Sequence, residues 1–402
     1  MTRKTVLILI AAAALSGLSA FPGQIPGRYK DVIAPYVDFL KTQKRGPVDY
    51  IMGLFERYDI VILCERFHPE TTQYDLIDGL VGDERFIAGV GNIFTEIGTS
   101  SNNGFLHDFM SSEGLSDAEA ESRVMHLYRN LYWGPYWEKH NFYDFLKRLY
   151  AINRSLPAAL KIHISFSDMP FSWEGMDKEK YGLFMNAIGR RDQVMAEQII
   201  KGFNDILRSP GARKKAMVIM NYRHAFNDNF KKPNGRKADN AGRFICEAFP
   251  GKVANVMINS VALLPGSTDR KSVITPIGGG KWDASFAAAG NPDLGFDFGG
   301  SPFGADHFDY FPFFKHDHDY QDVFTGFVFY KPLEKHRMLS GIPNLLGDGY
   351  DKIILERAVI SGYVEEGRAV DSIARIETVR ETTYDDLPSL LEKIGGWLSR
   401  GD

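Results

Sequence analysis

The chain has 402 residues, of which 47 are lysine or arginine and 51 are aspartate or glutamate, so its formal charge is −4. This near balance offers no basic stripe of the kind that binds nucleic acid, and we expect no nucleic-acid partner. Aromatic residues make up 13% of the chain, which is ample material for a large core. Only Cys64 and Cys246 occur, which excludes a disulfide scaffold and leaves open whether these two pair.

The N-terminus predicts export. Arg3 and Lys4 form a short basic segment, an apolar run follows over residues 6–18, and small residues end it at Ala20. This order is typical of a secretory signal peptide. The run is shorter than the roughly 20 residues that a membrane-spanning helix needs. We therefore predict a signal peptide over residues 1–20, a secreted or periplasmic mature protein, and no membrane insertion after cleavage.

Short apolar runs alternate with longer helical stretches in the mature chain, a pattern typical of a mixed, mainly parallel sheet flanked by helices. The predicted strands are 60–63, 86–96, 161–165, 216–220, 253–258 and 323–329. The predicted helices are 118–129, 142–152 and 178–208, with Gly189 as a candidate interruption in the last. We predict a single α/β domain over residues 21–402. It carries a helical insertion at about 104–156 and a Gly-rich, aromatic loop excursion at about 266–318.

Polar side chains follow three of the predicted strands. The first strand leads into Glu65 and His68, the second ends at Glu96, and the fourth is followed by His224. Ligands of open α/β sheets bind beyond the carboxyl ends of the strands, and imidazole and carboxylate groups can exchange protons there. Each motif alone also fits a solvated polar turn, and Glu96 could point outward by strand alternation. Their recurrence at three strand ends favours a site.

Four motifs stand in a definite order: Glu65-x-x-His68, Glu96, Arg191-Asp192-x-x-Met195-Ala196 and Asn221-x-x-His224. In that order they resemble the erythromycin esterase-like superfamily, which also includes the haem-iron-binding lipoproteins of the ChaN type. The Tiki/TraB proteases are more distant relatives. The resemblance covers roughly residues 55–260 and, more faintly, 322–331. Two positions depart from it, because the esterases usually have Gly where this chain has Cys64 and His where it has Asn221.

The resemblance implies roles for particular residues. His68 would be the general base that activates water, and Glu65 would orient it. Glu96 would position water or substrate, and His224 would assist the oxyanion or the leaving group. Arg191 would pair with a carboxylate or the substrate; from the sequence alone it could equally form a surface ion pair. The candidate substrate contacts are Arg66, Glu70, Asn221, Arg223 and His307.

The predicted function is hydrolysis of an ester, amide or related bond in a small-molecule or peptide substrate, with no cofactor. Alternatively, Glu65, His68, Glu96 and His224 could hold a divalent metal, as a Tiki/TraB-type protease would. Residues 306–307 and 316–318 could then supply further ligands. A third possibility is a ChaN-type protein that binds haem, iron or a small ligand without turnover. The sequence contains no Gly-x-Ser-x-Gly elbow, Walker loop or dinucleotide fingerprint.

Overall fold

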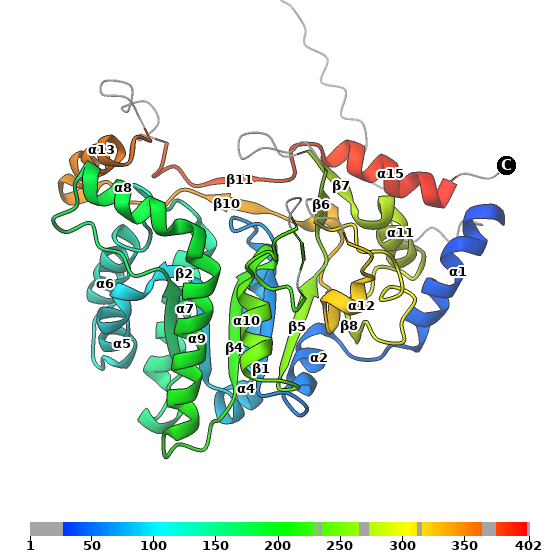
Figure 1. Cartoon of the computed structure of the whole chain (residues 1–402), viewed down its shortest axis with the longest axis horizontal. Coiled ribbons are helices and arrows are strands. Elements are labelled where there is room, and N and C mark those ends of the chain that lie inside the picture. The colour runs from blue at the N-terminus through cyan, green and yellow to red at the C-terminus, as the bar shows by residue number, and fades with distance from the viewer. Residues whose placement is uncertain are drawn as a thin grey trace, which may run out of the picture.

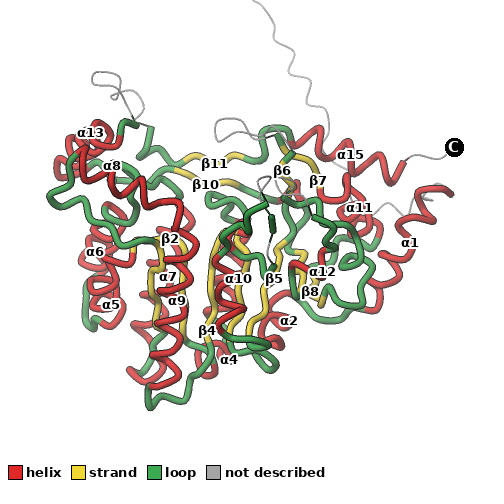
Figure 2. The backbone as a smooth tube through the Cα atoms, in the orientation of Figure 1, coloured by secondary structure: helices red, strands yellow, loops and turns green. Residues whose placement is uncertain are grey.

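A computed structural model describes residues 27–228, 230–231, 235–264, 273–311, 316–363 and 375–399. Its centre is a seven-stranded sheet in the order β3-β2-β4-β1-β5-β9-β8 (Figures 1 and 2). Only β8 runs antiparallel to its neighbour; the other pairings are parallel. The predicted α/β class is therefore confirmed. The strands are β1 (Ile60–Glu65), β2 (Asn92–Thr99), β3 (His163–Asp168), β4 (Ala216–Asn221), β5 (Val253–Ile258), β8 (Leu294–Asp297) and β9 (Gly326–Phe329).

Both faces of the sheet are covered by helices, which explains the nearly continuous apolar strands. Side chains alternate along a strand, so Val61 and Leu63 enter one core cluster while Ile60 and Ile62 enter the other. The first cluster includes residues of α2 (Pro47–Leu54), α3 (Thr72–Val81), α4 (Glu84–Gly89), α5 (Asn103–Ser111), α6 (Asp117–Arg129), α7 (His140–Ser155) and α13 (Tyr350–Ser361). The second includes residues of α1 (Gly27–Thr42), α9 (Arg191–Arg208), α10 (Ala241–Ala248), α11 (Lys281–Ala288) and α12 (Tyr320–Val323).

Two predicted strands are wrong in their first halves. Residues 86–89 belong to helix α4, which begins after Asp83 because the Asp83 side chain accepts a hydrogen bond from the backbone N–H of Arg85. Residues 320–323 form the short helix α12, and β9 begins only at Gly326. Apolar runs of this length do not distinguish a strand from a buried helix.

The predicted helix over residues 178–208 is two helices. A 3-10 turn, Ile188–Arg190, separates α8 (Lys178–Ala187) from α9 and contains Gly189, the residue expected to interrupt it. The predicted loop excursion also contains regular structure, because α11 and the edge strand β8 fall within it. Its aromatic residues, including Trp282 and Phe286, pack into the second core cluster rather than lying on a surface loop.

A two-stranded ribbon runs across the carboxyl ends of the main sheet (Figure 1). It pairs β10 (Met338–Ser340) with β11 (Arg380–Thr382). The backbone N–H of Leu339 donates to the carbonyl oxygen of Pro69 at 2.7 Å, and that of Gly341 donates to Glu138 O at 2.8 Å. The ribbon therefore fixes the loop that follows β1. A second ribbon pairs β6 (Val261–Leu263) with β7 (Ile274–Pro276), and α15 (Leu387–Ser399) closes the described chain.

Three further expectations concern the ends and the cysteines. Cys64 and Cys246 are both free thiols, which answers the question of their pairing. The predicted signal peptide, residues 1–20, lies outside the described residues. Across the part of the chain that the structure describes, no helix combines the length and apolar character needed to cross a membrane.

Candidate active site

Four neighbouring strands carry the site. In the order β3-β2-β4-β1, they bring Asp168, Glu96, Asn221 and Glu65 to the same edge of the sheet. Glu65 pairs in register with Asn221, and Thr99 of β2 pairs with Asp168. Because parallel strands end at a common edge, side chains more than a hundred residues apart in sequence become neighbours.

A shift in strand register lies beside Glu96. The pairing of β2 with β3 slips between Thr95 and Thr99, and Gly98 has a φ of 109°. A Cβ at Gly98 would lie 2.4 Å from the ring of Phe166, so only glycine fits there. Glu96 lies two residues after Phe94 and shares its face of the strand, the face that α9 covers. Its carboxylate is thereby directed toward the start of α9.

His68 is held on one side and open on the other. Its Nδ1 lies 2.6 Å from Glu65 Oε2, and Glu65 Oε1 accepts a hydrogen bond from the hydroxyl of Tyr74 at 2.8 Å. The proton is therefore assigned to Nδ1, which leaves Nε2 as the basic nitrogen, 3.8 Å from Glu96 Oε1. Burial lowers the pKa of His68. The charge and hydrogen bond of Glu65, with the charge of Glu96, outweigh burial and raise the pKa above its ordinary 6.5.

Glu96 and Arg191 form the centre of the site. Arg191 Nη2 donates to Glu96 Oε1 at 2.9 Å, and Arg191 Nε donates to Asp168 Oδ1 at 2.8 Å. The backbone N–H of Asn221 donates to Glu96 Oε2 at 2.7 Å. Burial alone would raise the pKa of Glu96, but the charges of His224, Arg191 and His68, together with the Asn221 N–H, hold that pKa far below its usual range. Glu96 is thus an ionised carboxylate inside the protein.

His224 lies near the same oxygen of Glu96 as His68 does. Its Nε2 lies 3.4 Å from Glu96 Oε1 and 3.2 Å from Arg191 Nη1. Its Nδ1 lies 2.7 Å from Asp192 Oδ1, which also accepts the backbone N–H of Ala241. Because arginine can only donate, the neutral His224 accepts at Nε2 and carries its proton on Nδ1. When protonated, its Nε2–H can donate to Glu96.

The structure brings together the five residues for which catalytic roles were expected. His68, Arg191 and His224 retain 21%, 19% and 15% of their side-chain exposure, so the site opens to solvent through its basic groups. Arg191 belongs to this cluster and not to a surface ion pair. The buried carboxylates of Glu65 and Glu96 lie beneath them. This arrangement can accept and return a proton and can stabilise negative charge.

Two expected substrate contacts, Arg66 and Glu70, are corrected. Both side chains are 0% exposed and pair at 2.8 Å. Arg66 Nη2 also donates to Asn259 Oδ1 and to the carbonyl oxygen of Tyr330, and Glu70 accepts the backbone N–H groups of residues 72 and 73. These contacts are all within the protein, so Arg66 and Glu70 hold the loop after β1 in place and are not available to a substrate.

Asn221 is likewise a positioning residue, not a substrate contact. It is buried, its Nδ2 donates to the Arg66 carbonyl oxygen at 2.6 Å, and its Oδ1 accepts from Arg223 Nε at 3.2 Å. Arg223 is exposed next to the site, so a substrate can reach it. The side chain at 221 thus fastens the loops after β1 and β4 to each other.

The other expected substrate contact, His307, lies in a separate cluster. Its ring stacks on His316, which stacks in turn on His318, with centroid separations of 5.3 and 5.5 Å. The neighbouring Asp306 accepts hydrogen bonds from Tyr36, Lys281 and Trp282. Asp306 therefore ties α1 to α11 and is not available as the metal ligand that the sequence suggested.

Three important residues were not among the predicted site residues. Asp168 ends β3 and holds Arg191, Tyr74 holds Glu65, and Asp192 holds His224. Asp168 carried the same signal as the others, a polar side chain at the end of an apolar strand, but the predicted strand stopped at residue 165. Nothing in the spacing of the sequence indicates that Tyr74 reaches back to Glu65.

The site residues do not fit a metal ion in this arrangement. Both oxygens of Glu65 are engaged by His68 and Tyr74, and both oxygens of Glu96 are engaged by Arg191 and the Asn221 N–H. The guanidinium of Arg191 occupies the position beside Glu96 Oε1 that a metal cation would need. Within the described ranges, no group of three or more histidine, cysteine, aspartate or glutamate side chains is placed to hold a metal.

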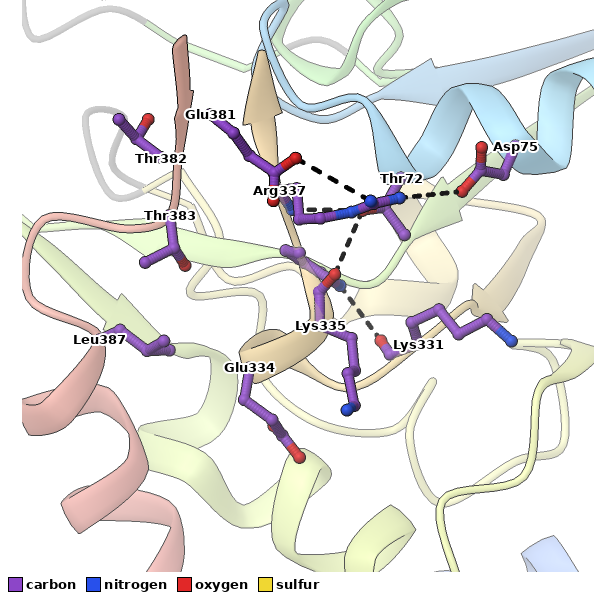
Figure 3. A pocket seen from close by; sticks show the side chains of 11 residues that line it. Thr72, Asp75, Lys331, Glu334, Lys335, Arg337, Glu381, Thr382, Thr383 and Leu387 are labelled. Carbon is purple, nitrogen blue, oxygen red and sulfur yellow. Dashed lines mark hydrogen bonds and ion pairs between the residues drawn. The ribbon is translucent and has the colours of Figure 1, made fainter. Parts of the chain in front are cut away.

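A separate pocket of about 810 Å³ lies beside the β10-β11 ribbon (Figure 3). Arg337 points across it, 3.6 Å from Asp75 and 4.0 Å from Glu381, and Lys331 and Lys335 lie nearby. None of the catalytic candidates lines it. Its charged groups are mostly exposed and balanced in sign, and its lining does not include the cluster around Glu96.

Comparisons of the sequence with protein-family models and with curated proteins give no match. Among solved structures, the chain is similar to a mutant of the erythromycin esterase EreC in its open conformation, at 12% identity and a TM-score of 0.45, over 69% of this chain and 92% of that one. It is similar to a Bacillus cereus protein at 11% identity and a TM-score of 0.43, over 76% of this chain and 98% of that one.

A third similar structure is a succinoglycan biosynthesis protein, at 9% identity and a TM-score of 0.45, over 76% of this chain and 97% of that one. An erythromycin esterase, the type of protein that the motifs resemble, is thus among the solved structures with a similar fold. At these TM-scores the likeness carries no argument about activity.

Proposed function

We propose that this chain is a secreted or periplasmic hydrolase of an ester, amide or related bond, and that His68 activates water. One observation carries the proposal. The Nδ1 of His68 is held by the buried Glu65 at 2.6 Å, while Nε2 faces the site with part of the ring exposed. An imidazole oriented by a carboxylate on one nitrogen and free on the other is the arrangement of a general base.

The reaction begins when His68 Nε2 takes a proton from water as the water oxygen attacks the carbonyl carbon. The imidazolium that forms lies between the carboxylates of Glu65 and Glu96, which stabilise its charge. The negative charge on the carbonyl oxygen is stabilised by the guanidinium of Arg191 and, when His224 is protonated, by its Nε2–H. The carbon–oxygen or carbon–nitrogen bond then breaks, and His68 returns its proton to the leaving group. The products are a carboxylic acid and an alcohol or amine.

Export is supported by the basic, apolar and small-residue segments in order over residues 1–20. The substrate is a small molecule or peptide, and the proposed reaction uses no cofactor. Water activation through imidazole requires only the residues of this chain.

Turnover of a panel of esters and amides by the purified protein tests the proposal. We expect His68→Ala to lower kcat/KM by about 10²- to 10⁴-fold, the usual contribution of a general base. The matched control is His163→Ala, which removes an exposed histidine at the amino end of β3. Equal turnover in the two variants, with unchanged far-UV circular dichroism, would show that His68 is not the base.

Metal and haem content of the same preparations separates this proposal from the binding alternatives. A colourless protein that hydrolyses a substrate without stoichiometric metal supports the imidazole mechanism. Stoichiometric metal or haem that is lost in His68→Ala would replace it with metal-dependent hydrolysis or ligand binding.

A further inference from the structure

An aromatic loop lies against the site. The segment between α6 and α7 contains Tyr132, Trp133 and Trp137. The ring of Trp137 packs edge-on to His68 with centroids 5.2 Å apart, and Trp133 Nε1 donates to Asp168 Oδ2 at 3.3 Å. Tyr132 lies between the two indoles, with centroid distances of 4.5 and 4.9 Å. We name these three residues the aromatic wall.

The aromatic wall is held in place by its surroundings. Trp173 Nε1 donates to the carbonyl oxygen of Tyr132 at 3.1 Å, and the backbone N–H of Thr99 donates to Leu131 O at 3.0 Å. A Cβ on Gly134 would lie 2.4 Å from Tyr132 Cε1, so the loop folds back on this ring only because residue 134 is glycine. The rings therefore have one defined position beside the catalytic histidine.

The two indoles of the wall present carbon rather than polar atoms. All three residues of the wall are partly exposed. The N–H of Trp133 is committed to Asp168. The N–H of Trp137 is enclosed and has no hydrogen-bond partner among the described residues, so none of the exposed area of Trp137 comes from its polar nitrogen. Partly exposed aromatic surface next to a proton-transfer group is suited to contact a bound molecule.

The charge of the site restricts what that molecule is. Four carboxylates, those of Glu65, Glu96, Asp168 and Asp192, lie around the two imidazoles and outnumber the two guanidiniums of the site, Arg191 and the exposed Arg223. An anionic substrate would lie among these carboxylates and be repelled. Flat apolar rings gain more from stacking on aromatic side chains than flexible chains do, because their geometry is matched and they lose less conformational freedom.

We propose that the aromatic wall is a specificity subsite for an uncharged substrate with a flat, apolar-faced ring next to the scissile bond. This inference rests on the proposed hydrolase function. Trp137 contacts the ring directly and so determines KM, while His68 performs the proton transfer. A linear alkyl chain of the same carbon number lacks the face that the wall recognises.

Hydrolysis of benzyl butanoate and heptyl butanoate tests the inference, because the two esters share their acyl group and the carbon number of their alcohol. In the wild-type protein the benzyl ester should have the lower KM. Trp137→Ala should raise KM for the benzyl ester about 3- to 10-fold, and for the heptyl ester much less. Trp397→Ala is the control, since that indole on α15 donates to Gly279 O, away from the wall. An equal change for both esters in Trp137→Ala would overturn the subsite.

A binding measurement distinguishes failure of this inference from failure of the proposed function. N-benzylbutanamide and N-heptylbutanamide are titrated into the wild-type and Trp137→Ala proteins by calorimetry. Ring-selective binding lost in Trp137→Ala, with no turnover of any ester, would retain the subsite and overturn the hydrolase. Turnover without ring selectivity in either measurement would retain the hydrolase and overturn the subsite.

Discussion

His68 and His224 direct their Nε2 atoms toward the same oxygen, Oε1 of Glu96, from 3.8 and 3.4 Å. Each imidazole is held at Nδ1 by a second carboxylate, Glu65 for His68 and Asp192 for His224. The charges of both histidines and of Arg191 lower the pKa of Glu96 and so stabilise its ionised form. Protonation of one imidazole therefore changes the electrostatic potential at the other, because both lie near Oε1 of Glu96.

The first prediction concerns pH. A general base works in its neutral form, so kcat/KM should rise with pH through the raised pKa of His68, above 6.5. Because the negative charge of Glu96 contributes to that rise, Glu96→Gln should lower the pKa and move the acidic limb of the profile to lower pH. Rates are measured across the acidic and neutral range. The control is Glu247→Gln, which removes a surface partner of Arg243 on α10. An acidic limb at the same pH in wild type and Glu96→Gln would contradict the assignment.

The second prediction concerns Arg191, whose planar fork joins Glu96 and Asp168. A lysine ammonium cannot span both carboxylates in the same plane, so Arg191→Lys should lower kcat/KM about 10- to 100-fold with the fold retained. Arg208→Lys, at the other end of α9 and paired with the exposed Asp205, should have wild-type activity. Wild-type kinetics in Arg191→Lys would show that charge alone suffices at this position.

Much of the site could be predicted because its residues occupy strand ends. Glu65, Glu96 and His224 each follow an apolar run, and a mainly parallel sheet gathers such ends at one edge. Strand order could not be predicted, because the composition of an apolar strand does not indicate which strands it pairs with. The placement of β2 between β3 and β4, which brings Asp168 to Arg191, is a property of the folded sheet.

Contacts made to the strand-end residues by helices and loops could not be predicted from the sequence either. Trp137 reaches His68 from the loop between α6 and α7, and Tyr74 reaches Glu65 from α3. Arg66 and Glu70 show the converse, because polar side chains beside a site motif were expected at the surface and instead form a buried pair. Polarity in the sequence does not indicate exposure when two such groups neutralise each other.

The third prediction concerns this buried pair. Arg66→Met removes the charged partner of Glu70 and leaves a carboxylate at 0% exposure with only backbone N–H donors, so the free energy of unfolding should fall by about 3–5 kcal/mol. Arg85→Met removes an arginine whose partners, Asp49 and Asp83, are near the surface, and it should change stability little. Urea unfolding of the three proteins measures both effects. Equal midpoints for the two variants would contradict the assigned role of the buried pair.

The fourth prediction concerns Asp283, a buried residue in the first turn of α11. Burial raises its pKa from 3.8 to about 7 in the folded protein. The folded state therefore holds this proton more tightly than the unfolded chain, and ionising Asp283 costs stability as pH rises from about 4 to about 7. Asp283→Asn removes that cost. The variant should melt several degrees above wild type at pH 8 and close to wild type at pH 4.

Asp351→Asn, a partly exposed residue in the first turn of α13, is the control and should show no such pH-dependent gain. An Asp283→Asn protein that is no more stable than wild type at pH 8 would mean that the carboxylate has a compensating partner when ionised.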